Sequence, residues 1–225
     1  VRRDTVLKGY ENIPEEFAQK LEDELERCGV RLVEDLKDAN ADLIIKATGR
    51  VPNFCQERFP FVAVDEWGYV KVDEFLETSL EGVFAVGDIV PPMGAGYAFE
   101  KARVVVHNIL YGKEKIFEPK RVPVIFSSAY QIGFVGSVKD AKVFATKPLS
   151  INPKAYVAEK NGVISVGFDD GGRLVYCCVM GKDVSEILNL CATFLGKELE
   201  EQPFAHPSYG EIMNEILSIK QEVCQ

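Results

Sequence analysis

The second half of the chain carries closely spaced β-strand patterns, and these constrain the fold more than any other feature. Three stretches are rich in β-branched and aromatic residues: VPVIFSSAYQIGFVG, AKVFATKPLS and GVISVGFDDGGRLVYCCVMG. Turn signals separate them at Asn161-Gly162 and in the DDGG run at 169–172, and short turns of this kind join antiparallel neighbours. Helical patterns over about 183–196 and 207–220 end the chain. We therefore predict an antiparallel sheet with helices after about residue 116.

The first half has the sequence pattern of an α/β domain. An amphipathic helix is predicted over 14–28, and Gly29 would end it as a C-cap. Strands are predicted at 30–36 and, as a buried strand, at 41–49. The fold class that follows is α/β and then α+β.

The rest of the first half predicts smaller elements. Residues 61–73 alternate around a Trp-Gly turn and make a candidate hairpin. A short strand is expected over 82–88, followed by a Gly/Pro loop and a helix from about 97 to 111. The predicted boundary between the two halves lies near 116.

Composition excludes several classes of function. The chain has 225 residues and a net charge of −9, which disfavours nucleic-acid binding because that rests on clustered Lys and Arg. No apolar run is long enough to span a membrane, and the charged N-terminus does not resemble a signal peptide. Six irregularly spaced cysteines match neither a disulfide framework nor a metal site, so a reducing cytoplasm is expected. Because the chain opens on Val1 with VRRDTVLKGY, which looks like the tail of a strand or loop, we expect a fragment of a longer protein.

The segment PFAHPSYGEIMNEIL, at 203–217, holds one of only two histidines. Proline is favoured at the first helical position, so Pro207 would place His206 at or just before a helix start, with Glu211 five residues on. Two interpretations stay open from these residues alone. His206 is either an acid/base group with a carboxylate behind it or a surface histidine that caps a helix.

A second candidate site lies in TSLEGVFAVGD, at 78–88. A predicted strand ends there in Gly87-Asp88 and enters a Gly/Pro-rich loop. A carboxylate at the carboxyl end of a strand can accept hydrogen bonds from sugar-like hydroxyls, and the glycine lets a ligand approach. The alternative is an aspartate that only caps a loop.

These motifs together resemble the flavin disulfide reductases, which use FAD and a nicotinamide nucleotide. The resemblance rests on ATGRVPN at 47–53 followed by TSLEGVFAVGD, on VPVIFSSAYQIGFVG at 122–136, and on AHPSYGE at 205–211. It covers roughly residues 10–220, and the last motif is similar to the dihydrolipoamide dehydrogenase version. The sequence departs from the family at Ala129, where proline is common, and at Ser208, which replaces a threonine.

The resemblance implies a role for each candidate residue. Asp88 would bind the ribityl and phosphate region of FAD, with Gly87 allowing close approach. His206 would act as acid/base toward a dithiol and Glu211 would orient it. The pair is expected to work in trans, so that catalysis requires a homodimer, and a dihydrolipoamide-bearing protein is a possible partner.

The resemblance also implies three segments and an incomplete enzyme. Residues 1–48 would be the remnant of a nicotinamide-binding domain, 49–115 a central FAD-contacting segment, and 116–225 a dimerisation domain. The glycine motifs for FAD and NAD and the redox cysteine pair of the family are absent, so the chain alone is expected to be inactive. Cys177-Cys178 do not replace that pair, because adjacent strand residues point to opposite faces.

The parent would oxidise dihydrolipoamide with NAD through FAD and a redox disulfide. The alternatives are a catalytically dead dimerisation module and a reductase of the same family with another substrate.

Overall fold

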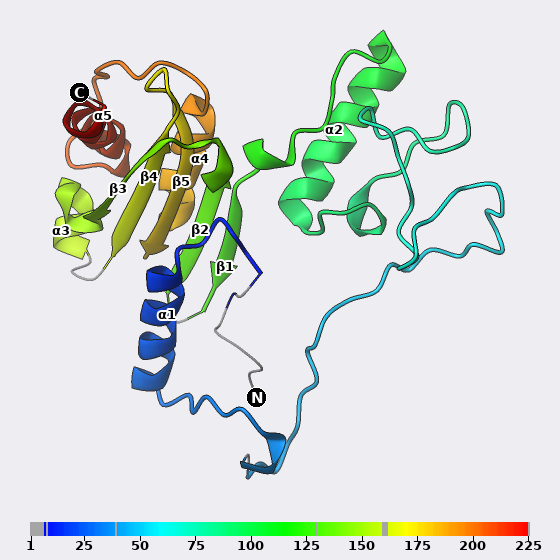
Figure 1. Cartoon of the computed structure of the whole chain (residues 1–225), viewed down its shortest axis with the longest axis horizontal. Helices are drawn as coiled ribbons and strands as arrows, with labels where there is room; N and C mark the ends of the chain where they lie inside the picture. The colour runs from blue at the N-terminus through cyan, green and yellow to red at the C-terminus, as the bar shows by residue number, and fades with distance from the viewer. Residues whose placement is uncertain (1–6, 8, 39, 129, 159–161, 225) are drawn as a thin grey trace. The chain divides into compact units, whose positions relative to one another are not determined.

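A five-stranded antiparallel sheet forms after residue 123, as the strand patterns predict. In the computed structural model its strands follow the spatial order β1-β2-β5-β4-β3 (Figure 1). They are β1 (Val124–Ser127), β2 (Gln131–Gly136), β3 (Val143–Pro148), β4 (Val163–Phe168) and β5 (Leu174–Gly181). Every pairing is antiparallel. Strands β4 and β5 join through the predicted DDGG turn, where Asp169 Oδ1 accepts hydrogen bonds from the backbone N–H groups of Gly171 and Arg173.

The structure describes residues 7, 9–38, 40–128, 130–158 and 162–224. The predictions made for Ala129, for Asn161 and for most of the first ten residues fall outside these ranges. The chain divides into two compact units, the first made of 1–42 with 123–225 and the second of 43–122. The structure thus has two compact units, whereas the sequence predicts three segments. The nicotinamide-binding, FAD-contacting and dimerisation roles of those segments stay predictions.

One face of the sheet is covered by the C-terminal helices. They are α4 (Val184–Phe194) and α5 (Ile212–Val223), close to the two long helices that the sequence predicts. Helix α3 (Pro153–Ala158), which precedes β4, adds Ala155 to the same core. Alternate residues of β5, such as Cys177 and Val179, pack with Ile187 and Ile216 in one apolar core. The predicted antiparallel sheet with helices is therefore confirmed.

Helix α1 (Glu15–Arg27) covers the other face of the same sheet. Its apolar stripe includes Phe17 and Leu21, which pack with Ile132, Tyr176 and Met180. The segment before α1 is also attached, because the Tyr176 hydroxyl donates to the backbone oxygen of Asn12 at 2.9 Å. The helix matches its predicted bounds closely. Its position on the sheet makes the first unit discontinuous in sequence.

The second unit is organised by one helix, α2 (Ala95–Tyr111), which agrees with the predicted helix. Two buried polar residues on α2 bind the surrounding loops. Asn108 donates to the backbone oxygens of Phe75 and Lys115, and Lys101 donates to the loop that follows Gly87. The predicted hairpin around Trp67-Gly68 is present as a single antiparallel bridge between Val64 and Val70.

Three strand predictions in the first half are wrong. Residues 30–36 form a coil that ends in a short 3-10 helix (Leu36–Asp38). Residues 41–49 are extended and exposed instead of buried, with Ile45 at 80% exposure. Residues 82–88 make one bridge, Glu77 with Phe84, before a 3-10 helix (Gly87–Ile89) begins. An extended segment becomes a strand only beside a partner, and the described part of 43–122 offers two isolated bridges and no sheet.

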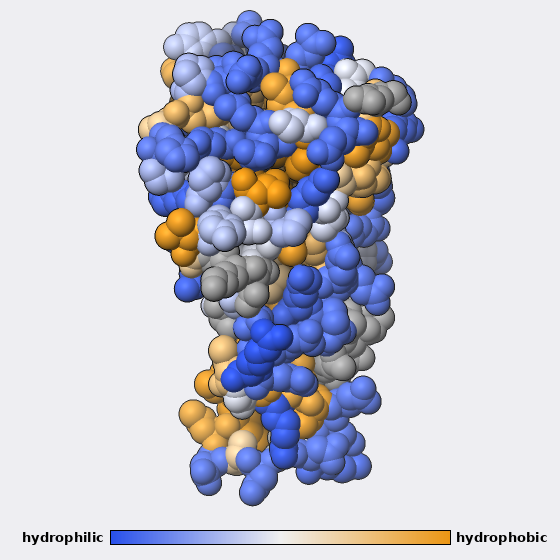
Figure 2. Space-filling model, turned by 90° about the vertical axis from the view of Figure 1, so that its left-hand side faces the viewer, coloured by the Kyte–Doolittle hydropathy of each residue, from blue (hydrophilic) through white to orange (hydrophobic). Residues whose placement is uncertain are grey.

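The visible surface agrees with the charged composition. Hydrophilic side chains cover most of the face in Figure 2, with smaller apolar patches between them. Among the helices of the described residues, none has the length and apolarity needed to cross a membrane.

Candidate functional site

His206 and Glu211 form a hydrogen-bonded pair on the first unit. His206 Nδ1 lies 2.8 Å from Glu211 Oε1, and the imidazole is 70% exposed while the Glu211 side chain is 18% exposed. The second carboxylate oxygen, Oε2, accepts the Ser208 backbone N–H at 2.8 Å. The carboxylate is therefore held by the backbone on one side and holds the imidazole on the other.

The helix after this pair begins later than the sequence predicts. A 3-10 turn covers Tyr209–Glu211, with Ser208 as its N-cap, and α5 follows from Ile212. Pro207 therefore lies before the cap and not at the first helical position. This shift explains how Glu211 reaches His206: the tight turn brings a residue five positions later back to the imidazole.

The electrostatics of the pair favour an ionised carboxylate. The hydrogen bond from His206 lowers the pKa of Glu211 below its ordinary value of 4.5, and the Ser208 N–H lowers it further. A carboxylate on Nδ1 favours the tautomer with a proton on that nitrogen, which leaves Nε2 as the acceptor. Glu215, one turn later, has its pKa raised by burial and by the charge of Glu211.

Asn152 is a positioning residue that the sequence reasoning missed. It is fully buried, and its side-chain N–H donates to the backbone oxygen of Ser208 at 3.0 Å. Its side-chain oxygen accepts the Ala155 N–H, at the start of α3. Asn152 thus links α3 to the turn that carries His206. The Asn-Pro dipeptide before a helical pattern was the available signal.

Gly87 and Asp88 lie on the second unit, and the structure adds Arg50 to them. Asp88 Oδ1 accepts the Gly94 N–H at 2.9 Å, and Oδ2 lies 3.2 Å from the Arg50 guanidinium. Gly87 has φ of +81°, and a Cβ added there would meet no atom within 4 Å. The site therefore presents a partly exposed carboxylate and a cation beside an open glycine.

This arrangement fits part of a flavin nucleotide. The carboxylate can accept hydrogen bonds from ribityl hydroxyls, the guanidinium can pair with phosphate, and the open glycine leaves room for close approach. It supplies only one side of such a site.

The cysteines behave as the sequence predicts. Cys177 packs in the core under α4 and α5, and Cys178 packs in the core under α1, so the two lie on opposite faces of β5. Burial raises the pKa of Cys178, and the pKa of Cys177 is raised by its contact with Cys191 and by burial. All six cysteines are free, and a buried neutral thiol is a poor nucleophile.

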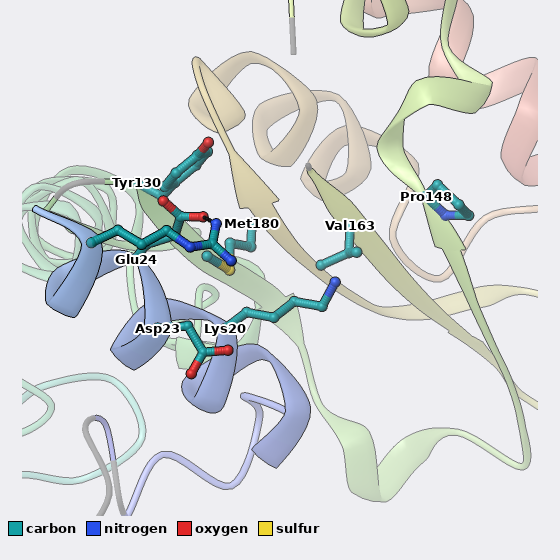
Figure 3. A pocket seen from close by; sticks show the side chains of 8 residues that line it. Lys20, Asp23, Glu24, Tyr130, Pro148, Val163 and Met180 are labelled. Atoms are coloured by element: carbon teal, nitrogen blue, oxygen red, sulfur yellow. Dashed lines mark hydrogen bonds and ion pairs between the residues drawn. The ribbon is translucent and has the colours of Figure 1, made fainter. Parts of the chain in front are cut away.

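A separate cavity of about 340 Å³ lies between α1 and the sheet (Figure 3). Lys20, Asp23 and Glu24 line it from α1, and Val163 and Met180 line it from the strands. It contains neither His206 nor Asp88.

Several known proteins are similar to this chain in sequence or in fold. Residues 14–109 match the model of a family described as pyridine nucleotide-disulphide oxidoreductase. Mycothione reductase of Mycobacterium tuberculosis (strain CDC 1551 / Oshkosh) is 31% identical over 200 residues, which cover 79% of this chain and 44% of that protein. This chain is similar to the pyridine nucleotide-disulphide oxidoreductases.

Two further proteins of related description are similar to this chain. Dihydrolipoyl dehydrogenase of Vibrio cholerae (serotype O1, strain ATCC 39315 / El Tor Inaba N16961) is 29% identical over 187 residues, covering 76% of this chain and 39% of that protein. The solved structure of the HOCl-induced flavoprotein disulfide reductase RclA from Escherichia coli matches with a TM-score of 0.64 and 26% identity. That match covers 77% of this chain and 44% of RclA. The chain thus spans less than half the length of these oxidoreductases.

Proposed function

We propose that this chain is the C-terminal part of an enzyme resembling dihydrolipoamide dehydrogenase, which oxidises a dithiol with NAD. The observation that carries the proposal is the 2.8 Å contact between His206 Nδ1 and Glu211 Oε1, with the imidazole exposed. An oriented imidazole that can reach an external group is what proton transfer with a thiol requires. A histidine that only capped a helix would not need its own carboxylate, and the N-cap position of the turn is occupied by Ser208 and not by His206.

The acid/base step assigns one role to each residue. His206 Nε2 accepts the proton of a substrate thiol, which leaves the thiolate, the form that attacks a disulfide. Glu211 stays ionised and stabilises the imidazolium that results. Asn152 holds the turn so that the imidazole keeps its position.

The cofactors of the family are FAD and a nicotinamide nucleotide, and we propose NAD for this protein. When bound, they carry the two electrons that the dithiol loses. Asp88 would contact the ribityl chain of FAD, and Arg50 would contact its phosphate. Gly87 would leave room for FAD to approach the backbone closely. Most of the FAD site, the NAD site and the redox cysteine pair would come from outside these 225 residues, so the chain alone would not oxidise dithiols.

We further propose that the protein works as a homodimer in a reducing cytoplasm. An exposed His206 on a dimerisation unit can act on the redox disulfide of the partner subunit. A dihydrolipoamide-bearing protein would deliver the dithiol. Six free cysteines are consistent with a reducing compartment.

Two alternatives are kept. The similarity to mycothione reductase favours another disulfide substrate within the same family. The coverage of less than half of each relative would also suit a catalytically dead dimerisation module.

The test is to isolate the protein from its source with an antibody to this chain and to record its mass and flavin absorbance. A flavin-containing protomer longer than 225 residues is then assayed with dihydrolipoamide and NAD, and with mycothione and NADH or NADPH. The proposal expects NAD reduction, and H206Q should lower that rate by roughly 10²–10⁴-fold. Activity with mycothione alone would favour the alternative of another disulfide substrate. A colourless dimer of the 225-residue chain would select the dimerisation module.

A further inference from the structure

Lys101 is a lysine that the mechanism above does not use. It lies on α2, its relative exposure is 0%, and its ammonium is directed at a single loop. Fully buried lysines are rare unless their charge is compensated. The surroundings of Lys101 therefore need an explanation.

The ammonium has three backbone acceptors in that loop. Nζ lies 3.2 Å from the Gly87 oxygen and 2.7 Å from the Pro92 oxygen, and it also donates to the Val90 oxygen. A lysine ammonium has three N–H donors, so these contacts use all of them. The ring of Phe117 lies 5.4 Å from Nζ and closes the site with a favourable cation–π contact.

The same loop carries the candidate flavin contact. Asp88 lies between two of the residues that Lys101 holds, and its carboxylate is fixed in turn by the Gly94 N–H and by Arg50. Asp88 is also the charged group that acts on Lys101 electrostatically, in the direction that favours the ammonium. The backbone of the loop is thus held by Lys101 and by the Val70 N–H, which donates to the Ile89 oxygen at 2.9 Å. The Asp88 side chain is held by Gly94 and Arg50.

We propose that Lys101 is a positioning residue that holds the 87–92 loop and so sets where Asp88 presents its carboxylate to a ligand. The nature of that ligand rests on the proposed function, but the positioning itself does not. Three contacts from one fully buried side chain restrict the loop more strongly than a single hydrogen bond could. A lysine that only filled space would need no matching set of acceptors.

The charge state of Lys101 gives a readout that packing alone would not. Burial lowers the pKa of Lys101 from 10.5 to about 8. Above that pH the neutral amine keeps two N–H donors, so one of the three carbonyls loses its partner. We therefore expect the loop to loosen as the pH rises through about 8.

The experiment is amide hydrogen exchange on the full 225-residue chain, read at Val90 and Gly94. Val90 N–H donates to Gly87 and Gly94 N–H donates to Asp88, so both amides report the loop. After correction for the intrinsic pH dependence, K101M should raise their exchange by about tenfold or more, as expected for lost hydrogen bonds to a charged group. Lys71→Met, the same change at an exposed lysine of the same unit, should leave both amides unchanged.

The pH dependence of exchange also tests the positioning role of Lys101. Wild type should show the increase above pH 8, and K101R, which keeps its charge, should show no such pH step. Equal exchange in wild type and K101M, or no pH step in wild type, would overturn the positioning role. If K101M fails to fold, the wild-type pH series still tests it. If the protomer isolated from its source binds flavin, and Asp88→Asn binds it equally well, the proposed flavin contact of Asp88 is rejected. The positioning role of Lys101 is not affected by that result.

Discussion

Glu211 accepts two hydrogen bonds at once, one from an imidazole and one from the chain that carries it. E211Q replaces the carboxylate by an amide of the same shape, which can present either an oxygen or an N–H to Nδ1. We predict that His206 loses its preference for a proton on Nδ1. Long-range ¹H–¹⁵N NMR of the imidazole nitrogens measures that preference directly. Glu222→Gln, on α5 and paired with Lys147, is the control and should leave the imidazole signals of His206 unchanged.

The pH dependence of stability follows from the same carboxylate. The pKa of Glu211 is lowered in the folded protein, so its charged form contributes stability above pH 4.5, and that contribution is lost as pH falls through the folded pKa. We predict that wild type loses thermal stability between about pH 5 and pH 3 more steeply than E211Q. Parallel curves for the two proteins would contradict the contribution of Glu211.

Thiol reactivity separates the six cysteines into two groups. Cys28, Cys55 and Cys224 are exposed, whereas Cys177, Cys178 and Cys191 are buried. Because burial disfavours the thiolate, we predict that Ellman's reagent modifies the first three in the native protein and all six in denaturant. Rapid native modification of Cys177 or Cys178 would show that the strand cysteines are accessible.

Sequence reasoning identified residues that meet in the structure where local geometry decides the contact, while their catalytic roles stay predictions. His206 and Glu211 are five positions apart, and a capped turn is enough to join them. Lys101 and Asn152 were missed because their partners are backbone oxygens of loops, 9–14 and 56 positions away. No pattern in the sequence marks a carbonyl as an acceptor, so such contacts appear only once the loops are folded.

At the scale of elements, α1 stabilises the sheet face on which it packs. Phe17 is fully buried against strand residues, and F17A removes most of a large apolar side chain from that contact. We predict a loss of roughly 3–5 kcal/mol in the free energy of unfolding, measured by urea denaturation. Glu26→Ala, on the exposed side of the same helix, is the control and should change it by less than about 0.5 kcal/mol.

The elements that the sequence predicted correctly carry a local signal of their own, either a short turn to a neighbour or a helical period. Antiparallel neighbours such as β4 and β5 are joined by a short turn, and helices α1, α2, α4 and α5 carry their own periodicity. The predicted strand at 41–49 is wrong because a local pattern does not provide the neighbouring strand that a strand requires. Its apolar run fits a buried strand, but the described residues provide no neighbouring strand, so Leu43, Ile44 and Ile45 stay exposed.

For the whole molecule, the division into two units predicts how the chain responds to a protease. Lys46 and Arg50 are exposed in an extended segment, so trypsin should cut there early. Because α1 belongs to the first unit, residues 1–46 should remain bound to the rest after the cut. Size-exclusion chromatography followed by mass spectrometry measures this. Separation of the peptide in wild type would contradict the packing of α1, and release after F17A would support it.

The placement of α1 also has a consequence for the order in which the chain folds during synthesis. Phe17 leaves the ribosome about a hundred residues before Ile132, its neighbour in the same core. At bacterial and eukaryotic translation rates this gap lasts roughly 5–20 s, far longer than a helix needs to form. The apolar stripe of α1 therefore remains exposed to solvent until the strands on which it packs have been synthesised. We expect that stripe to be a surface that a chaperone binds before β2 and β5 have been synthesised.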